Sequence, residues 1–569
     1  MVLHTTPYSG ACLHFLDGLS WSLVFPCYWL LDQLLASCVA TSLEKHRRSQ
    51  DPCSFLTLCV LISAPLYLLL LLASLPLALL GFVIWAPLQA VRQPYLYTHR
   101  RLVWTFIRKK QWGVGLGEWR PQGRSFCFCS ANVCLLPDSL ARFNNLSDTH
   151  RRAREVGKRI RNGARALAPG ILLLTAPEPD PQEEEAETGN HRPGEQTAGD
   201  TGSMTASRES LARYHGGDGG IGISSNNTLS HVPRTSIFKR PGRKRRHGDE
   251  TFDHEISAFF PANLDFLALQ EVFDHGSTTR LRRQLHRYFP YVLSDVGRYG
   301  WKGCCSSFKF LNSGLMLASR YPILDARFEC YPNGRGEDAL AAKGALFAKV
   351  HVGTSHQEQR VVGYLTCTHL HAIEGDASVR CEQLDLLLQW GAEFRQSSSQ
   401  PPEGEKVLED LVAFDVVLGD LNFDNCSSED KLEQQHALFT QYKDPCRLGP
   451  GEDKPWALGL QPWSKLQSSD PFPSPCVSAR VMENEEGRKE YLVFPPSKSH
   501  CPASSQKGRK IPLKGNGRRI DYMLYSDEGL SLLLLLQEIE EFSFVTQLAG
   551  LTDHLSVAMR LAEDSGGER

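Results

Sequence analysis

Residues 414–425 read FDVVLGDLNFDN, an apolar run that ends in a cluster of acids and amides. Asp420, Asn422, Asp424 and Asn425 follow one another within six residues. A strand that is buried on both faces is built from a short apolar run of this kind. Polar side chains directly after such a strand indicate a site at its end, and we interpret Asp424 and Asn425 as turn formers.

Other segments of the chain end in the same way. They are SFCFCSAN (125–132), DFLALQE (265–271), YLTCTH (364–369) and, after a loop, GLTDH (550–554). Residues two apart in a strand point to the same face, so we expect Asp420 to lie beside Asn422 and His369 beside His371. Carboxylate and amide oxygens suit a hard metal ion, and histidine accepts or donates a proton. Together these residues form a set that can cleave a phosphoester.

The size and charge of the chain limit its class. It has 569 residues, which exceeds one ordinary domain, and its formal net charge is −2. A protein that mainly coats nucleic acid usually has a strong basic excess, so this balance argues against such a role. The 17 cysteines form no CxxC pair, and no cleavable signal peptide precedes the first apolar stretch. We therefore expect reduced cysteines and a main domain that faces the cytosol.

Two hydrophobic segments lie within residues 1–100, which we expect to form an α-helical, membrane-associated region. Residues 11–36 contain two acids and are marginal as a membrane-spanning helix, whereas residues 55–88 carry no charge. Basic residues flank the second segment on both sides, and positive charge marks the cytoplasmic side of a membrane. This pattern favours a re-entrant segment. A single tilted crossing and a buried pair of core helices are the alternatives.

The flanks of the second hydrophobic segment predict contacts with lipid. Cys53 and Cys59 lie at the expected membrane edge, where reversible palmitoylation is common; ordinary apolar cysteines are the alternative. The basic residues on either side are expected to attract anionic phospholipid head groups. The membrane attachment is therefore predicted to have hydrophobic, acyl and electrostatic parts.

The rest of the chain predicts one catalytic domain that is divided by an insertion. Residues 119–176 hold its first strand and a basic helix, and residues 251–565 hold the remaining strand and helix patterns. Residues 177–250 are rich in acids, then in Gly, Ser and Thr, and then in Lys and Arg. Such a composition cannot bury enough apolar surface to fold, so we predict a disordered linker there. The expected fold class is α+β, a two-layer β-sandwich flanked by helices.

A family resemblance follows from the short motifs ANV (131–133), LQE (269–271), SGL (313–315), SRYP (319–322), THLHA (368–372), GDLNFDN (419–425), RRIDY (518–522) and LTDH (551–554). In their order and spacing they resemble the endonuclease/exonuclease/phosphatase superfamily, which has the DNase I-like fold. Their wider context resembles the neutral sphingomyelinases, and the amino-terminal hydrophobic pair is most similar to the type 2 branch. The resemblance covers nearly the whole chain and is weakest at 177–250 and around 460–510. It implies a phosphoric diester hydrolase.

The resemblance implies which residues bind the metal and the phosphate. Glu271 is the expected ligand of Mg²⁺, with Mn²⁺ as a substitute, and Asp553 is expected to complete the metal contacts. Asn132 would orient the phosphate or the waters of the metal. Asp420 and Asn422 would position the attacking water and the phosphoryl oxygens.

The resemblance also implies the residues that move protons. His554 is the expected general base, and Asp521 would orient its imidazole. His369 would stabilise the transition state or protonate the leaving group, because it matches the superfamily motif. His371 could take either role or contact the substrate, and this choice stays open.

One lysine is a further candidate for substrate binding. Lys343 would close on the substrate phosphate, and Asp338 would compete for it as a switch. An exposed lysine at the start of a strand is the alternative interpretation.

The expected reaction is an in-line attack of water on sphingomyelin, which yields ceramide and phosphocholine at a membrane. One alternative is a phosphoesterase of the same superfamily that acts on another phospholipid, a phosphoinositide or a nucleic acid. The other is a membrane scaffold with an inactive site. The expected location is the Golgi or the cytoplasmic leaflet of the plasma membrane, with other endomembranes, including mitochondria-associated ones, also compatible. The sequence predicts no oligomeric state.

Overall fold

The computed structural model describes residues 3–41, 44–45, 55–100, 125–165, 253–297, 308–399, 409–454, 456–457, 518–526 and 537–563. The chain divides into two compact units, one formed by residues 1–166 and 236–569 and the other by residues 167–235. Every described residue belongs to the first unit. The predicted linker at 177–250 and Cys53 lie outside the described residues.

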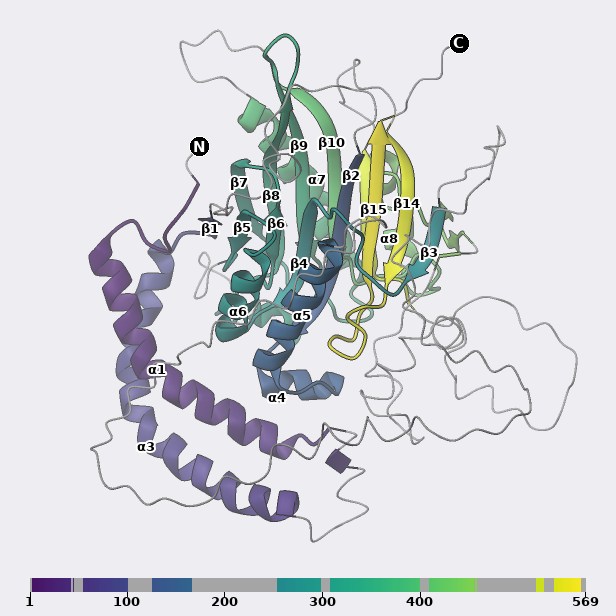
Figure 1. The fold of residues 1–569 in the computed structure, drawn as a ribbon. Helices are drawn as coiled ribbons and strands as arrows, with labels where there is room; N and C mark the ends of the chain where they lie inside the picture. Colours follow the sequence, from purple (N-terminus) through teal and green to yellow (C-terminus); the bar gives the residue numbers. More distant parts are fainter. Residues whose placement is uncertain are drawn as a thin grey trace, which may run out of the picture. The chain divides into compact units, whose positions relative to one another are not determined.

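Two β-sheets form the body of the first unit (Figure 1). The larger sheet has the strand order β1-β5-β6-β4-β2-β15-β14-β3. Its strands are β1 (Leu96–His99), β2 (Ser125–Leu135), β3 (Asp253–Ser257), β4 (Phe266–Val272), β5 (Tyr291–Ser294), β6 (Met316–Ser319), β14 (Gln537–Val545) and β15 (Ser556–Glu563). β2 runs parallel to β4, although residues 136–265 separate them in sequence. Strands from the two expected parts of the domain therefore lie side by side.

The smaller sheet has the order β13-β10-β9-β8-β7. Its strands are β7 (Ile323–Cys330), β8 (Gly344–Thr354), β9 (Arg360–His369), β10 (Leu411–Asp420) and β13 (Asp521–Ser526). β9 and β10 are parallel to each other, whereas the remaining neighbours are antiparallel. The short strands β11 (Arg447–Gly449) and β12 (Glu452–Asp453) form a separate antiparallel pair.

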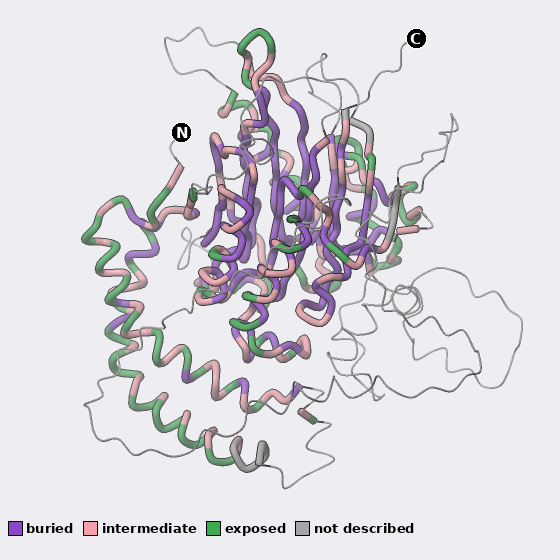
Figure 2. The backbone as a smooth tube through the Cα atoms, in the orientation of Figure 1, coloured by how far each residue is buried: buried purple, intermediate pink, exposed green. Residues whose placement is uncertain are grey.

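Apolar side chains fill the space between the two sheets. Phe128 of β2 and Phe266 of β4 both contact Phe414 of β10, with ring centroids 5.0 and 5.3 Å apart. Burying a side chain of this size stabilises a fold by about 1.5–3 kcal/mol. Figure 2 shows the strands of both sheets as mostly buried. The predicted α+β class and two-layer sandwich are confirmed.

Helices cover the outer face of each sheet. α5 (Thr149–Ala164) and α6 (His275–Leu285) pack on the larger sheet, and α5 does so through Val156 and Ile160, which lie one turn apart. α7 (Ala377–Ser399) packs on the smaller sheet through Leu384 and Leu387. The shorter helical turns are α4 (Asp138–Ala141), η1 (Arg142–Asn144), η2 (Gly336–Leu340), α8 (Lys431–Gln434) and α9 (Leu438–Gln441).

The two predicted hydrophobic segments are the helices α1 (Ala11–Cys38) and α3 (Phe55–Val91). They pack closely, because a Cβ placed on Gly81 of α3 would lie 2.8 Å from the Cβ of Leu23 in α1. Both helices bend (Figure 1) and both contain proline, which removes a backbone donor and kinks a helix. Among the described helices, Val60–Val91 alone is long and apolar enough to cross a membrane by length and composition. The re-entrant path stays a prediction.

Polar contacts attach the amino-terminal helices to the sandwich. The Asp32 carboxylate of α1 accepts hydrogen bonds from the backbone N–H groups of Asp138 and Ser139, at 3.2 and 2.9 Å. These groups begin α4, so Asp32 caps a helix of the catalytic domain. Arg92, just after α3, donates to the carbonyl oxygen of Gly297 at 2.8 Å. Asp32, which disfavours a membrane crossing by α1, therefore has hydrogen-bond partners at the start of α4.

Candidate active site

Five polar residues meet at one end of the sandwich because of the strand directions. β2 runs parallel to β4 and β9 parallel to β10, so each pair ends at the same edge of its sheet. Asn132 and Glu271 lie near the ends of β2 and β4, and His369 is paired with Asp420 at the ends of β9 and β10. β13 is antiparallel to β10, so its first residue, Asp521, is paired with Asp420.

The side chain of Asn132 joins the two sheets. Its Nδ2 donates to Glu271 Oε1 at 2.9 Å and to Asp420 Oδ2 at 3.0 Å. Its Oδ1 accepts from the backbone N–H of Cys134 at 3.1 Å. Contrary to the sequence prediction, the strand does not end at Asn132, because β2 continues to Leu135 through an irregularity in its pairing with β4. One amide therefore holds two carboxylates together.

Glu271 has a backbone conformation that residues other than glycine rarely adopt. Its φ is 60°, in the left-handed region, which costs an L-residue about 1–2 kcal/mol. The pairing of β2 with β4 shifts register between Asn132 and Leu135, beside Glu271. Irregularities of this kind redirect a side chain, and strain of this kind is concentrated at functional sites. The local distortion aims the Glu271 carboxylate at Asn132.

The carboxylates of this cluster have raised pKa values. Loss of solvent contact, followed by the charge of Asp553, raises the pKa of Glu271. Burial, followed by the charge of Asp521, raises the pKa of Asp420 to about 6. The surroundings of both carboxylates therefore disfavour their ionised forms, and a nearby cation would stabilise those ionised forms.

The donor set fits a hard divalent cation. Ligand atoms of Glu271, His369 and Asp420 all lie within 4.8 Å of one another. Asp553 is buried, and its charge acts on Glu271. Carboxylate oxygens are the ligands that Mg²⁺ prefers, and the raised pKa values indicate a shortage of positive charge. The residues present therefore fit the predicted metal.

His554 forms a pair with Asp521. Its Nδ1 lies 2.7 Å from Asp521 Oδ2, and its Nε2 lies 3.9 Å from Asp420 Oδ2. Burial alone would lower the pKa of His554, but the Asp521 carboxylate raises it well above the ordinary histidine value. Because Asp521 accepts the proton on Nδ1, Nε2 is the atom that can take up a second proton. The sequence predicted this pairing.

Lys343 lies inside the cluster and is only 6% exposed, so the alternative of an exposed lysine is wrong. Its Nζ lies 2.7 Å from Asp338 Oδ1 and 3.1 Å from His369 Nε2. An ammonium group only donates, so Nε2 of His369 accepts and its proton sits on Nδ1. Burial, followed by the charge of Lys343, lowers the pKa of His369 well below its ordinary value. Nδ1 of His369 is buried and has no partner among the described residues.

Both strands end before the second member of each expected pair, so alternation of faces does not decide where His371 and Asn422 lie. Asp420 and Asn422 are nevertheless in contact, because Asp420 Oδ1 accepts from the backbone N–H of Asn422 at 3.0 Å. β9 ends at His369, and His371 instead holds two acids, with Asp338 at 2.9 Å and Asp376 at 2.8 Å. β10 ends at Asp420, and Asn422 has a left-handed φ of 54°. The Asn422 amide donates to the carbonyl oxygen of Leu370 at 3.0 Å. The rule of alternating faces applies only within an extended strand.

The end of the FDVVLGDLNFDN stretch contains one turn former and one anchor. Asp424 accepts from the backbone N–H of Cys426 at 3.0 Å, which is the geometry expected of a turn. Asn425 is fully buried, and its amide donates to Gly449 O at 3.0 Å and to Asp453 Oδ1 at 2.7 Å. Asn425 therefore also ties this loop to the β11–β12 pair.

Sequence reasoning missed Arg152, which is 5% exposed. Its guanidinium donates to Cys134 O at 2.9 Å, just beyond Asn132, and to Leu551 O at 2.9 Å, just before the TDH loop. The described residues offer it no carboxylate partner. Its helical spacing of four residues from Val156 places it on the buried face of α5, which is the signal that could have revealed it. Arg152 joins the segments that carry the amide and the base.

Arg152→Lys should lower kcat about tenfold or more at temperatures well below unfolding, because an ammonium cannot bridge several carbonyl groups as the guanidinium fork does. The measurement is steady-state hydrolysis of a phosphodiester substrate beside a thermal unfolding curve. Arg151→Lys is the matched control, since Arg151 is exposed and adjacent in sequence. A lowered unfolding midpoint with unchanged kcat would leave Arg152 with a purely structural role.

Comparisons with known proteins cover the whole chain. Residues 12–91 match the family model described as the neutral sphingomyelinase N-terminal transmembrane region. Residues 237–541, more than half of the chain, match the endonuclease/exonuclease/phosphatase family. Sphingomyelin phosphodiesterase 3 of Homo sapiens and that of Mus musculus are each 48% identical, and sphingomyelin phosphodiesterase 5 of Danio rerio is 39% identical. Each of these alignments covers 100% of this chain and 100% of the relative.

Proposed function

Because this chain belongs to the sphingomyelin phosphodiesterase family, we propose that it hydrolyses sphingomyelin to ceramide and phosphocholine at a membrane, with Mg²⁺ as cofactor. Membership of the family makes it a phosphoric diester hydrolase. The observation that carries the proposal is the contact of His554 with Asp521, 2.7 Å long, beside the buried carboxylate of Asp420. A proton acceptor and phosphate-positioning groups are thereby available in one place.

In this proposal His554 is the general base. Its neutral imidazole has a lone pair on Nε2, because Asp521 accepts the proton on Nδ1. As the oxygen of the attacking water forms a bond to phosphorus, the bond from phosphorus to the ceramide oxygen breaks. The proton of the water passes to Nε2, and Asp521 stabilises the imidazolium that results.

Asn132, Asp420 and Asn422 position the water and the phosphoryl group. Glu271 and Asp553 would hold Mg²⁺, or Mn²⁺ in its place, which when bound supplies positive charge opposite the phosphoryl oxygens. The support for this assignment is the amide of Asn132, which donates to both Glu271 and Asp420 at 2.9 and 3.0 Å. Donors fixed in advance cost no reorganisation when charge develops in the transition state.

The ceramide oxygen leaves with negative charge and needs a hydrogen-bond or proton donor. His369 is assigned the hydrogen bond, because its Nδ1 carries a proton and is buried without a partner among the described residues. Its ring is neutral, so the ceramide oxygen takes its proton from solvent water, and His554 returns its own proton to solvent. Lys343 would contact the substrate phosphate after leaving Asp338, which now lies 2.7 Å away. We assign His371 to the support of Asp338 and not to the substrate, because both of its ring nitrogens contact carboxylates.

The other candidate substrates are phosphoinositides and nucleic acids, and the other candidate role is an inactive scaffold. The test incubates the full-length chain in mixed micelles with sphingomyelin, phosphatidylinositol 4,5-bisphosphate or an oligonucleotide. We expect phosphocholine release from sphingomyelin, dependent on Mg²⁺, and little product from the other two. Faster cleavage of either competitor would overturn the substrate assignment, and no cleavage at all would support a scaffold.

We further propose that the amino-terminal region attaches the enzyme to the Golgi or to the cytoplasmic leaflet of the plasma membrane. The match of residues 12–91 to a transmembrane region supports membrane association. The basic flanks of the second segment would bind anionic phospholipids, and palmitoylation of Cys53 and Cys59 would strengthen attachment. Cys53 lies outside the described residues, and Cys59 lies in α3.

A re-entrant path for the second segment places the amino terminus and the catalytic domain on the cytosolic side. Tags placed before residue 2 and after residue 569 should therefore both be digested by protease in cytosol-out vesicles. Vesicles permeabilised with detergent provide the control for protease access. Digestion of only one tag in sealed vesicles would show a single crossing.

A further inference from the structure

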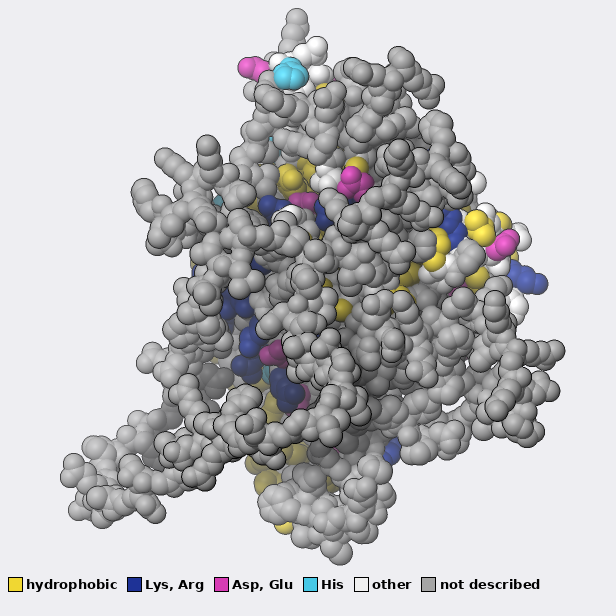
Figure 3. All heavy atoms as spheres, turned by 45° about the vertical axis from the view of Figure 1, so that its right-hand side comes forward, with side chains coloured by type: hydrophobic (Ala, Val, Ile, Leu, Met, Phe, Trp, Pro, Cys, Tyr) yellow, Lys and Arg dark blue, Asp and Glu magenta, His cyan; other side chains and the backbone are white. Residues whose placement is uncertain are grey.

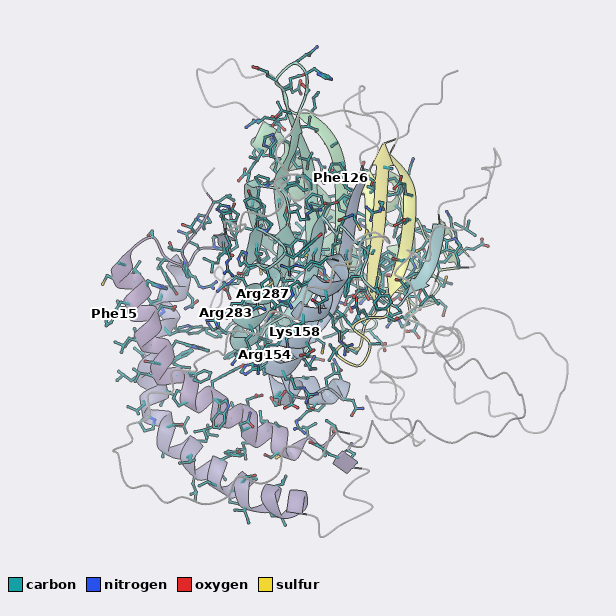
Figure 4. The ribbon with its side chains drawn as sticks, viewed as in Figure 1. Phe15, Phe126, Arg154, Lys158, Arg283 and Arg287 are labelled. Carbon is teal, nitrogen blue, oxygen red and sulfur yellow. The ribbon has the colours of Figure 1, made fainter. Side chains whose placement is uncertain are left out.

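The outer surface of α5 and α6 carries a concentration of positive charge. We call it the α5–α6 basic face, and its exposed or half-exposed members are Arg151, Arg154, Lys158, Arg280, Arg283 and Arg287. Glu155 is the single acid within α5, and α6 contains no acid. Figure 4 labels Arg154, Lys158, Arg283 and Arg287, which lie in one region of the view, over the two helices.

The charges of this face are largely uncompensated within the described part of the chain. Lys158 approaches Glu155 at 3.4 Å, but both side chains are well exposed, so their pairing contributes little. Arg151, Arg154 and Arg283 form no ion pair with any described residue. Neighbouring cations that turn inward differ; Arg282, for example, is paired with Asp295 at 3.2 Å. Arg151, Arg154 and Arg283 are therefore available to an anionic partner.

An open hollow lies beside α5. Its volume is about 440 Å³, and it is lined by Arg151, Arg154, Glu155, Lys158, Arg159 and Leu551. Leu551 precedes Asp553 and His554 in the loop that carries the proposed base. In Figure 3, Lys and Arg side chains gather left of the centre of the view with Asp or Glu side chains among them, and hydrophobic side chains lie below. Four of the six side chains that line this hollow are cations, and Glu155 is its one acid, so a phosphate group placed there would meet a net positive charge.

The basic face adjoins an apolar surface. The Trp21 ring of α1 contacts the ring of His275, the first residue of α6, at a centroid distance of 6.0 Å. The helix α1 exposes large apolar side chains, including Phe15 at 69%, Phe25 at 43% and Trp29 at 44%. Soluble proteins seldom expose apolar patches of this extent, whereas membrane-bound helices do. Cations beside an exposed apolar surface are the arrangement found at the boundary of lipid tails and anionic head groups.

We propose that the α5–α6 basic face binds the head groups of anionic phospholipids, with a phosphate in the hollow beside Leu551. This site is separate from the basic flanks of the second hydrophobic segment, because it belongs to the catalytic domain. It would draw the domain onto the bilayer to which the amino-terminal region is proposed to attach. The proposal does not depend on the identity of the substrate, since it concerns lipids that are not cleaved.

The test uses the full-length chain in nanodiscs of phosphatidylcholine alone or with about 30 mol% phosphatidylserine. Arginine modification by a glyoxal reagent, read by mass spectrometry, reports contact with lipid independently of activity. We expect slower modification of Arg151, Arg154 and Arg283 in the phosphatidylserine discs. The protection should vanish at about 0.5 M salt, where the Debye length is about 4 Å.

The triple variant Arg151→Gln, Arg154→Gln, Lys158→Gln should lose the protection of Arg283 that phosphatidylserine provides. Each cation near an anionic surface contributes about fivefold to partitioning, so three should contribute about 100-fold. Activity in discs without phosphatidylserine should be unchanged, because none of the three residues belongs to the proposed catalytic cluster. The matched control is Arg327→Gln, Arg360→Gln, Lys431→Gln, which removes the same charge from the smaller sheet and its loops.

Three outcomes would overturn the proposal. Equal protection of Arg283 in both kinds of disc would show that the face does not contact anionic lipid. Full protection in the α5 triple variant would assign lipid binding to other cations, such as those of the amino-terminal flanks. An equal loss of Arg283 protection in the control variant would show that the effect depends only on the net charge of the protein. None of these outcomes bears on whether sphingomyelin is the substrate.

Discussion

His554→Ala should lower kcat by at least about 10²–10⁴-fold, because general base catalysis by a positioned imidazole supplies that much. The Asp521 carboxylate at 2.7 Å fixes the ring and leaves Nε2 free to accept a proton, 3.9 Å from Asp420. His369 Nε2 lies 3.7 Å from Asp420 but accepts from Lys343, so it is not the expected base. Binding to lipid vesicles should be unchanged, since that function is proposed for the amino-terminal helices and the α5–α6 basic face, and His554 belongs to neither. Steady-state phosphocholine release and vesicle flotation measure the two quantities.

The same pair predicts the pH dependence of the reaction. The pKa of His554 is raised in the folded chain, so the neutral base forms only above that raised value. Activity should therefore increase with pH through a midpoint above about 6.5, the unperturbed histidine value. Asp521→Asn removes the carboxylate that raises the pKa, so its midpoint should move to lower pH. Its maximal kcat should fall less than that of His554→Ala, because the proton acceptor remains.

Two control variants separate the base from other histidines. His356 is exposed at the turn between β8 and β9, and His356→Ala should leave kcat unchanged. His371→Ala should act through stability, because it leaves Asp338 and Asp376 without their shared partner. A loss of kcat in folded His371→Ala equal to that of His554→Ala, with a mild effect of His369→Ala, would contradict the choice of His369. Near-normal turnover of His554→Ala would end the proposed mechanism.

Glu271→Gln should reduce kcat by several orders of magnitude at saturating substrate, because an amide is a poor ligand for Mg²⁺ in place of a carboxylate. Raising the Mg²⁺ concentration should restore only part of the activity, and EDTA should abolish the activity of the wild type. Isothermal titration with Mg²⁺ provides a readout that does not depend on turnover. If Glu271→Gln kept its activity in EDTA, the reaction would not depend on the metal.

The stability of the same variant distinguishes a ligand from a structural residue. Loss of solvent contact and the charge of Asp553 raise the pKa of Glu271, so its ionised form destabilises the fold above the unfolded pKa. In EDTA the unfolding temperature of Glu271→Gln should therefore equal or exceed that of the wild type. Mg²⁺ should stabilise the wild type more than the variant. Glu329→Gln, which breaks the 2.9 Å pair with Arg327 on β7, is the control outside the cluster.

The sequence predicted the residues of the cluster because their positions follow from simple strand geometry. Apolar runs that end in polar groups, together with the family motifs, predicted that Glu271, His369 and Asp420 belong to one site. The parallel pairs β2–β4 and β9–β10 explain why the ends of these strands meet. The same geometry failed just past the strand ends. His371 and Asn422 lie beyond β9 and β10, where the backbone turns and alternation of faces no longer applies.

Contacts between distant segments were beyond prediction from one sequence. Arg152 reads as one of many cations in a basic helix, yet it alone among them reaches both Cys134 O and Leu551 O. Asp32 reads as an obstacle to a membrane helix, yet it accepts from the first backbone groups of α4. Such partners depend on how α5 and α1 pack on the sandwich, and local sequence patterns do not predict this packing.

Hydrolysis of sphingomyelin in water enriched in ¹⁸O tests the central claim most directly. If a water activated by His554 attacks phosphorus, mass spectrometry should find ¹⁸O in phosphocholine and none in ceramide. His554→Ala should lose this product in the same proportion as it loses turnover. Label in ceramide together with unlabelled phosphocholine would mean that water attacks carbon and that the carbon–oxygen bond breaks, and this result would contradict the proposed reaction.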